Sequence, residues 1–457
     1  MLRHLIIIGA IVFLGGATVA AAEGDESPSR YSDKVLGLKT PEQLPSRPTP
    51  LFELWQDYVN QGPYEYEFEF PTGMVVSPGL LLYGNLSTGL QITDNGVDQT
   101  KSEWVSTLDM FVNVTFSGTE RFLIGMSPLK RQNGKKTRFE LSPDYSFKNE
   151  NNARISVAFF EGEISEMFPK IDMEGRLPLD YEIAIGRQPV LSQGGVLIND
   201  TMDSIAITRS TVPIKGTNFA RIGGLFAWNN VNRSNNIDDD DGLLYALFSS
   251  VEVAHSNIDI DLAYVDSSDA IGDQFNVAAT FIKPIIMFEH DVDTTIRIAS
   301  SFTPDGETAQ ATDGTMLYTS FSWAPKKTVD LIYLNAFAAN NDYAPAARAA
   351  GGPLGITGLL FAPNGLGGAA IGNAAKHTYG GALGYQMFFS PKLRRNLIFE
   401  IGGKVDNTAG GIDRFGTAVR YSQAVGQRAF FEIGGFAVGQ RSIDDAYGLR
   451  TKLNVIF

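Results

Sequence analysis

The stretch Tyr447-Gly-Leu-Arg-Thr-Lys-Leu-Asn-Val-Ile-Phe457 predicts the fold of the chain. Two sets of residues alternate along it: Leu449, Thr451, Leu453, Val455 and Phe457 share one parity, and Arg450, Lys452 and Asn454 share the other. Successive side chains of a β-strand point to opposite faces. The stretch is therefore expected to form an amphipathic strand with one apolar face and one polar face.

This strand resembles the terminal strand of Gram-negative outer-membrane β-barrels, which ends on Phe with apolar residues at alternate positions before it. The resemblance implies that Tyr447–Phe457 closes a barrel and that Phe457 is an assembly signal for the barrel-assembly machinery. A soluble, secreted β protein is the alternative reading of the same pattern.

The N-terminus has the layout of a secretory signal peptide. Arg3 and His4 precede an apolar run, and small residues ending at Ala22 follow it. Such a run is too short to span a membrane. We expect residues 1–22 to be removed on export.

Composition narrows the classes of protein further. The net charge is −14 and cysteine is absent, which disfavours nucleic acid as a partner and excludes disulfides, thiolate metal sites and covalent haem. After the signal, no apolar run approaches the ~18 residues of a membrane-spanning helix. A membrane protein with this sequence must be a β-barrel, because only helices and closed barrels satisfy every backbone group in lipid.

Residues 23–71 are rich in proline and form a predicted periplasmic leader. The segment Leu51–Val59 is expected to be a short amphipathic helix, and a plug inside the barrel is the alternative role for the leader. Residues 72–457 are assigned to the barrel.

Alternating segments follow one another from Gly79 onward. In one of them Leu108, Met110 and Val112 oppose Asp109 and Asn113. We count about 18 such segments, with 16 as the alternative, each near the ~9–11 residues that a tilted membrane strand needs. The predicted fold is an all-β, antiparallel transmembrane β-barrel.

The connections alternate between short and long, as expected of a barrel with both termini in the periplasm. The predicted short turns are Ser117–Glu120, Ala254–Asn257, Ala324–Thr328 and Ala424–Gln427. The predicted long outer connections are Lys130–Asn152, Arg187–Asp203, Asn229–Gly242, Pro304–Gly314 and Asn340–Lys376.

Charged residues repeatedly occupy the polar face of the predicted strands, where they would line the lumen and set ion preference. The basic candidates are Arg154, Arg221, Arg297, Lys404, Arg414, Arg420, Arg450 and Lys452. The acidic candidates are Glu182, Asp259, Asp261, Glu400 and Glu432.

The long connection Asn340–Lys376 is rich in Ala and Gly and contains an apolar patch. Long loops without secondary structure are usually functional, and this patch would be costly to expose on the surface. We therefore expect the connection to fold into the barrel and narrow it. The candidate constricting residues are Leu354, Leu359, Leu360 and Phe361.

A run of four aspartates, Asp238, Asp239, Asp240 and Asp241, offers oxygen ligands for a cation. The run lacks the ligand spacing of a calcium loop, so a solvated acidic loop is the preferred interpretation. No metal or other cofactor is predicted.

Gly186-Arg-Gln188, Gln193-Gly-Gly195 and the stretch that begins at Asp203 resemble the alginate-export family of 18-stranded outer-membrane barrels. In that family a strand ending in Gly-Arg-Gln precedes a loop and a strand that begins with Asp. The resemblance implies a lumen with basic residues for an anionic polymer, whereas the acidic chain does not reproduce the family's other basic positions.

Catalysis is not expected, because no nucleophile motif is present and the four histidines are dispersed. The sequence favours an outer-membrane porin for selective, passive passage of a hydrophilic, charged small solute. Lipid, lipopolysaccharide and the assembly machinery are the expected partners, and a homotrimer is one possible assembly. An export conduit for an anionic polymer and a barrel that sheathes a partner protein are the alternatives.

Overall fold

The computed structural model describes residues 48–56, 66–174, 176–287, 289–363, 365–389 and 394–457. The predicted signal peptide and most of the predicted leader lie outside these residues. Among the described helices, none has the length and apolar character needed to cross a membrane.

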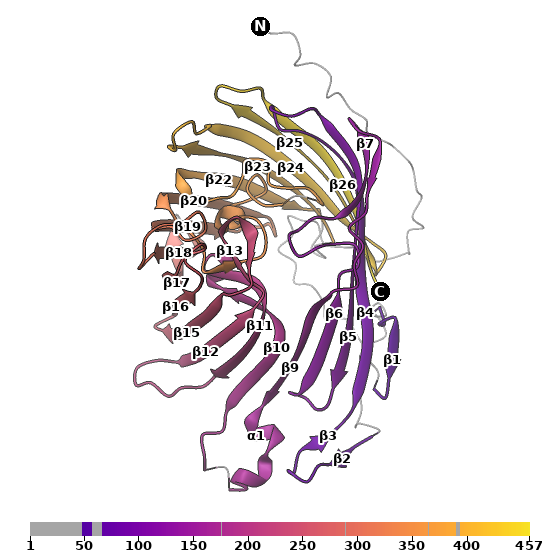
Figure 1. Ribbon diagram of the computed structural model, residues 1–457, viewed down its shortest axis with the longest axis vertical. Coiled ribbons are helices and arrows are strands. Elements are labelled where there is room, and N and C mark those ends of the chain that lie inside the picture. Colours follow the sequence, from indigo (N-terminus) through magenta and orange to yellow (C-terminus); the bar gives the residue numbers. More distant parts are fainter. Residues whose placement is uncertain (1–47, 57–65, 175, 288, 364, 390–393) are drawn as a thin grey trace.

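The wall of the molecule is a closed antiparallel barrel of 18 strands, as the sequence predicts (Figure 1). Its strands are β4 (Gly79–Asp94), β5 (Lys101–Thr115), β6 (Arg121–Met126), β9 (Ile155–Glu163), β10 (Tyr181–Ser192), β11 (Ile198–Arg209), β12 (Phe219–Asn229), β15 (Leu243–Val253), β16 (Ser256–Asp266), β17 (Gln274–Met287), β18 (His290–Phe302), β19 (Gly314–Trp323), β20 (Leu331–Asp342), β22 (Lys376–Phe388), β23 (Arg395–Asp406), β24 (Arg414–Val425), β25 (Ala429–Gln440) and β26 (Ala446–Ile456).

The last strand closes the wall against the first. In the register of β26 and β4, Tyr447 lies opposite Asp94 and Ile456 lies opposite Asn85. The backbone of Phe457 then exchanges two hydrogen bonds with Gly84, at 2.8 and 3.0 Å. A side chain at Gly84 would collide with the ring of Phe457, 2.7 Å from an added Cβ, so glycine is the residue that lets the terminal aromatic ring lie against β4.

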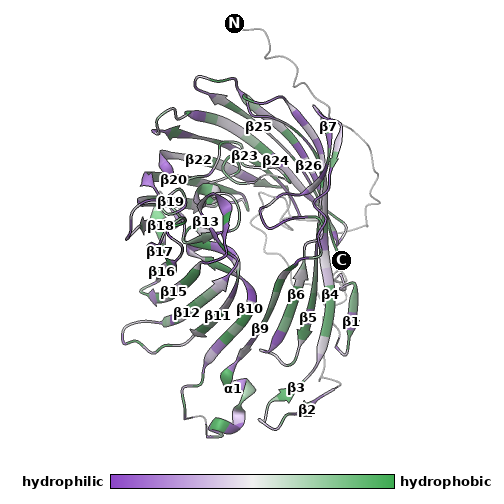
Figure 2. Ribbon diagram, in the orientation of Figure 1, coloured by the Kyte–Doolittle hydropathy of each residue, from purple (hydrophilic) through white to green (hydrophobic). Residues whose placement is uncertain are grey.

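Side chains of the wall alternate between the two faces. In β26, Leu449 is 52% exposed on the outer face, whereas Arg450 is 6% exposed on the inner face. Figure 2 shows hydrophobic residues recurring along wall strands such as β5 and β6, interrupted by hydrophilic ones. Because apolar side chains gather on the outside, the barrel has the lipid-facing surface of a membrane protein.

The two rims of the barrel differ in their connections. The turn rim, which holds Gly79 and Phe457, has short turns such as 116–120, 254–255 and 324–330. The loop rim at the opposite end carries the long connections 127–154, 230–242, 303–313 and 343–375. Ala254 and His255 both have positive φ, at 47° and 60°, which is the geometry of a tight two-residue hairpin turn.

Two connections depart from the predicted order of short and long. The outer loop predicted at Arg187–Asp203 is wrong, because β10 and β11 run through both ends of it and leave only 193–197 between them. On the turn rim, 164–180 is long and contains α1 (Ile164–Met167) and the 3₁₀ helix η2 (Pro169–Asp172). It lies at the same end of the molecule as the hairpin of β2 (Phe68–Glu69) and β3 (Val75–Val76) (Figure 1).

The leader also differs from the prediction where the structure describes it. Phe52–Leu54 forms the strand β1, which pairs with β4. The amphipathic helix predicted over Leu51–Val59 is therefore wrong for its described part, and residues 57–59 lie outside the described residues.

Candidate functional site: a lumen narrowed by two inward segments

The tip of the β10–β11 hairpin leaves the wall and enters the lumen. The pairing of β11 with β12 becomes irregular between Asp203 and Ser204. Beyond that point the side chain of Gln193, in the 3₁₀ helix η3 (Gln193–Gly195), accepts a hydrogen bond from the Thr280 hydroxyl of β17. Ser192 donates to the carboxylate of Asp261 in β16. The tip is thus held against the inner face of the wall, far from its own neighbours in sequence.

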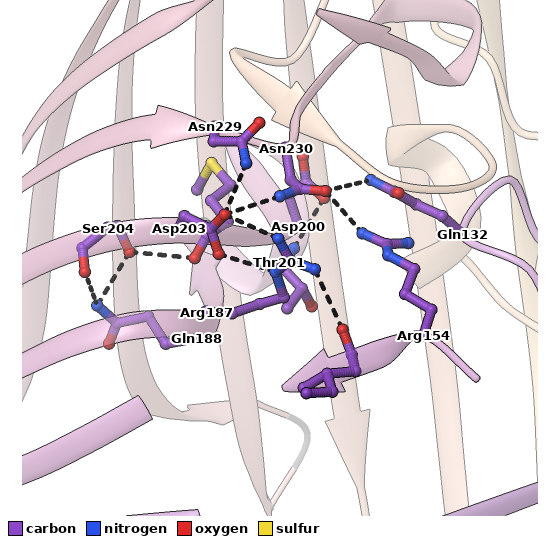
Figure 3. Close-up of polar contacts among 12 residues, drawn as sticks. Gln132, Arg154, Arg187, Gln188, Asp200, Thr201, Asp203, Ser204, Asn229 and Asn230 are labelled. Atoms are coloured by element: carbon purple, nitrogen blue, oxygen red, sulfur yellow. Dashed lines mark hydrogen bonds and ion pairs between the residues drawn. The ribbon is translucent and has the colours of Figure 1, made fainter. Parts of the chain in front are cut away.

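A polar network marks the point where the hairpin departs (Figure 3). The guanidinium of Arg187 donates to both carboxylate oxygens of Asp203, each at 2.8 Å, and to the carbonyl of Ile155 at 3.1 Å. The side-chain amides of Asn229 and Asn230 donate to the same carboxylate at 2.7 and 3.0 Å. A two-pronged ion pair and three further hydrogen bonds thus join the hairpin to the chain at Ile155, Asn229 and Asn230.

The Gly-Arg-Gln motif therefore has a structural role in this chain. Gly186 has a φ of 123°, and an added Cβ would lie 2.3 Å from the Ala158 carbonyl oxygen. Gln188 donates from its amide to the Ser204 hydroxyl at 2.9 Å. Both Gly186-Arg-Gln188 and Asp203 lie inside strands, whereas the family resemblance implies a strand end and a strand start.

The connection 343–375 is the second inward segment. Its short strand β21 (Ala347–Arg348) pairs in parallel with β11, where Ile198 lies opposite Ala347. Leu354, Leu360 and Phe361 are fully buried, and Leu359 is 8% exposed. They pack with residues of the hairpin tip, including Val196 and Leu197, in one hydrophobic cluster. Burying this apolar surface holds the two inward segments together.

Charged side chains of the wall hold the backbone of this connection. The carboxylate of Glu400 accepts hydrogen bonds from the backbone N–H groups of Leu359 and Leu360, both at 2.8 Å, and from the Tyr333 hydroxyl. An added Cβ at Gly358 would lie 2.2 Å from the same carboxylate. Such an arrangement satisfies a buried carboxylate that would otherwise be costly in a barrel interior.

Basic side chains contribute to the same attachment. Arg450 donates to the Gly368 carbonyl at 2.7 Å, and Arg414 donates to the Ile371 carbonyl at 3.2 Å. Arg297 lies beneath the other inward segment, with its guanidinium nitrogens 3.1 Å from the position of an added Cβ at Gly194. Arg450 and Arg414 thus bond to the backbone of the connection 343–375, and Arg297 lies close to Gly194 at the tip of the β10–β11 hairpin.

Several predicted lumen charges are therefore covered, which corrects the expectation that all of them line open lumen. Asp261, Arg297, Glu400, Lys404, Arg414 and Arg450 lie on the inner face, and all except Arg414 are buried. Lys404 lies 3.8 Å from Asp406, and the others contact the inward segments. Asp261, Arg297, Glu400 and Arg450 therefore lie against the inward segments, whereas Lys404 and Arg414 also line a cavity of about 480 Å³.

The other predicted charges are more accessible. Lys452 and Glu432 lie 3.7 Å apart on neighbouring strands and are each about one quarter exposed. Asp259 accepts a hydrogen bond from Asn257 at 3.0 Å. Arg221 is exposed on β12, and Arg420 is partly exposed on β24. Arg154 and Glu182 line cavities at opposite ends of the lumen.

Two adjoining cavities remain on the loop-rim side, between β5, β9 and the inward segments. They have volumes of about 560 and 240 Å³, and both are lined by Arg131, Gln132, Asn152 and Arg154. The guanidinium of Arg154 donates to the Asn230 side chain at 2.7 Å (Figure 3). Desolvation and the nearby Arg187 guanidinium lower the pKa of Arg154. The two cavities therefore share a basic wall.

Acidic side chains offset part of the positive charge of this wall. Asp200 lines the smaller cavity and Asp238 the larger one. Burial raises the pKa of Asp238, and the neighbouring carboxylate of Asp240 raises it further. Arg131 is paired with Glu150 at 2.6 Å. The excess of basic charge over the two cavities is therefore modest.

A third cavity of about 260 Å³ lies toward the turn rim. Glu161, Glu163 and Glu182 line it, and Arg121 pairs with Glu161 at 2.5 Å. The described lumen therefore has a basic wall at one end and an acidic wall at the other.

The aspartate run does not converge on one point. Asp239 is buried and lies 3.4 Å from the guanidinium of Arg233, and it also accepts a hydrogen bond from Ser267 at 2.7 Å. Asp238 faces the larger cavity. Among the described residues, no group of three or more His, Cys, Asp or Glu is arranged to hold a metal ion.

Sequence reasoning missed several residues of the cavities. Lys130 and Arg131 belong to the connection 127–154, which also contains the strands β7 (Thr137–Ser142) and β8 (Ser146–Lys148). The basic pairs Lys130-Arg131 and Lys135-Lys136 in an otherwise acidic chain were the available signal. Phe111 lines the smaller cavity and stacks on Tyr83, with ring centroids 5.5 Å apart.

The wall defines the class of architecture, a closed 18-strand antiparallel barrel like those of outer-membrane porins. Comparison with protein-family models gave no match, and comparison with curated protein sequences gave none either.

Solved structures match over most of the chain. Similar structures include the outer membrane protein OpdK of Pseudomonas aeruginosa, with a TM-score of 0.55, 10% identity and coverage of 82% of this chain and 98% of OpdK. OccAB3 of Acinetobacter baumannii matches with a TM-score of 0.54 and 10% identity, over 83% of this chain and 99% of OccAB3. OccK3 of Pseudomonas aeruginosa matches with a TM-score of 0.53 and 9% identity, over 83% of this chain and 95% of OccK3. At these identities the likeness shows the shared fold.

Proposed function

We propose that this protein is an outer-membrane porin that gives selective, passive passage to a hydrophilic, charged small solute. The observation that carries the proposal is the pair of loop-rim cavities with Lys130, Arg131 and Arg154 in their walls. They lie in a barrel whose lumen is narrowed by segments of its own chain. Charged groups at close quarters in a narrow pore set ion preference.

In this proposal the inward segments form the constriction. Residues 193–197 and 343–375 occupy lumen space next to the cavities, and their attachment to Thr280, Glu400 and Arg450 keeps them in place. The turn rim faces the periplasm and the loop rim faces the outside, as is usual for barrels with short and long connections. The N-terminus is then periplasmic after signal cleavage.

The lumen geometry favours the porin over the two alternatives. A conduit for a polymer needs a continuous wide passage, and a sheath needs room for a partner protein. Here the chain's own residues Leu354, Leu360 and Phe361 fill part of the interior as a packed cluster. Partnership with lipopolysaccharide and the assembly machinery, and a homotrimer, remain predictions.

Recording single channels in planar bilayers tests the proposal. The purified protein is expected to give stable conductance steps, and Arg154→Glu is expected to shift ion preference toward cations. Arg441→Glu is the matched control, because Arg441 is exposed on the loop rim, pairs with Asp413 and does not line either basic cavity. Absence of conductance would contradict the open-pore proposal.

Vanillate is a suitable first solute. A structure of Pseudomonas aeruginosa OpdK, 10% identical to this chain, was solved with vanillate. Because vanillate is an aromatic carboxylate, a basic cavity that contains Phe111 offers it both charge and ring contacts. Liposome swelling with vanillate and with an uncharged phenol of similar size measures how much the carboxylate contributes to the rate of solute entry.

A further inference from the structure

The seam of the barrel is incomplete where the last strand stops. β26 pairs with β4 only as far as Asn85, and Phe457 bonds to Gly84. β4 itself continues to Gly79 and remains paired on its other edge with β5 as far as Thr115. The edge of β4 from Gly79 to Tyr83 therefore extends past the end of the closing strand.

The segment 48–56 covers this edge. Phe52, Glu53 and Leu54 of β1 lie antiparallel to β4, opposite Leu82, Leu81 and Leu80 respectively. An open strand edge exposes unpaired backbone groups and readily accepts another strand. β1 thus occupies the place that a longer β26 would have filled.

The side chains of β1 continue the pattern of the wall. Phe52 and Leu54 are exposed, at 49% and 40%, and lie beside the lipid-facing residues Leu82 and Leu80. Glu53 has the opposite parity and is less exposed. This alternation matches the apolar outer face and polar inner face of the neighbouring strands.

Contacts at both ends of the segment hold it in this register. The Gln56 side-chain amide donates to the Ser77 carbonyl at 2.6 Å, just before β4 begins. At the other end Arg428, in the turn between β24 and β25, donates to the Thr49 carbonyl at 3.1 Å and hydroxyl at 3.3 Å. The segment therefore bridges from the first wall strand to the turn beside the last ones.

We propose that the edge of β4 at Leu80–Leu82 is a strand-addition site and that residues 48–56 are its occupant, forming a clasp that completes the barrel seam. Strand addition gives affinity through main-chain hydrogen bonds and selectivity through alternate side chains. The clasp sequence meets both requirements, with backbone pairing along β4 and apolar side chains toward lipid. This inference does not depend on which solute the barrel passes.

Hydrogen exchange measured by mass spectrometry tests the clasp. Replacing Phe52, Glu53 and Leu54 together by proline removes every backbone donor of the paired residues, and replacing all three by alanine keeps those donors. The proline variant is expected to lose protection at Leu80 and Leu82, whose backbone N–H groups lie on the same edge of β4 as that of Gly84, which bonds to Phe457. The N–H of Leu81, which lies on the β5 edge, and the amides of β4 that pair with β26 are expected to keep their protection in the same molecule. Equal protection at Leu80 and Leu82 in the two variants would overturn the proposal.

A peptide of residues 48–56 added to the proline variant supplies the missing strand. It is expected to restore protection at Leu80 and Leu82 and to bind the wild-type protein much more weakly, because the site is already occupied there. A peptide with proline at the three paired positions is the matched control. Failure of the native peptide to bind or protect the proline variant would count against a strand-addition site.

Disulfide cross-linking tests the register of β1 with β4 while the backbone pairing of the clasp is kept. Because the chain contains no cysteine, a Phe52→Cys, Leu82→Cys double variant can form only the disulfide that the register predicts. Phe52→Cys, Leu86→Cys is the control, since Leu86 faces Val455 of β26. A disulfide in the first pair and none in the second supports the clasp, and the reverse result, or no disulfide in either, overturns it.

Discussion

The lipid-facing wall and the interior of this barrel are specified in different ways. In the wall, backbone pairing runs from strand to strand and a simple alternation decides which side chains face out, as with Leu449 and Leu453 in β26. In the interior, position depends on single side chains that bond to backbone far away in sequence, as Glu400 does with Leu359 and Leu360. The wall is therefore a repeating structure, whereas the interior is a set of individual attachments.

The largest expected effect tests whether the two faces of the wall have been assigned correctly. Leu453→Arg places a charge on the outer face and is expected to cost about 2–4 kcal/mol of unfolding free energy if it lies near the membrane midplane. Lys452→Gln, one position away on the inner face, is expected to leave assembly intact. Urea unfolding in lipid vesicles measures both variants. Equal losses from the two substitutions would show that the assignment of faces is wrong.

The wall was predictable because its signal is local and repeated. The alternation around Leu108 to Asn113, the short turns at 116–120 and 254–255 and the final aromatic residue each pointed to the same barrel. No knowledge of distant contacts was needed, since lipid on one side and lumen on the other impose the same period on every strand.

The interior was predictable only in part. The apolar patch Leu354–Phe361 indicated a buried connection because exposure would be costly, and the structure places that connection against the inner wall. The strands through Arg187 and Asp203 were missed because they run on past the point where the pairing of β11 with β12 becomes irregular, and their tip contacts the inner wall. A strand in such surroundings has no lipid face, so its sequence loses the alternation that identifies the others.

Roles of charged residues were the least predictable. Arg154 and Arg450 both lie on inward-facing positions, yet one lines a cavity and the other holds the Gly368 carbonyl. The alternation along a strand shows only which face of the wall a side chain points to. Which part of a loop covers that face depends on contacts between residues 40 to 82 positions apart, and a single sequence does not display them.

An intermediate effect is expected where the interior is detached from an intact wall. Glu400→Gln keeps the size of the side chain but leaves one of its buried donors facing an amide NH₂ group, and an unsatisfied buried donor costs about 1–3 kcal/mol. The connection 343–375 is expected to loosen, which raises the single-channel conductance and its noise. Bilayer recordings measure both quantities.

Glu432→Gln is the control for this prediction. Its partner is Lys452 at 3.7 Å, and the pair joins two wall strands without contacting the connection. Conductance and noise are expected to remain near wild type in the control. If Glu400→Gln also left them unchanged, the connection would not be the part of the interior that limits the current.

The smallest expected effect concerns a single contact between the connection 127–154 and the inward connection 343–375. Lys136, in the connection 127–154 outside the wall strands, donates from its ammonium to the Leu366 carbonyl at 2.7 Å. Burial, helped by the nearby charges of Lys130, Lys452 and Arg450, lowers the pKa of Lys136 to about 8. Its charge is therefore present below that pH and is lost as pH rises through it.

The anion preference of the pore is expected to fall slightly from about pH 7 to about pH 9, because the Lys136 ammonium loses its charge over this range. Reversal potentials measured across a salt gradient detect the change. Lys136→Met is expected to abolish it, and Lys135→Met, at the exposed neighbouring position, is expected to retain it. An unchanged pH response in Lys136→Met would place the titrating group elsewhere in the lumen.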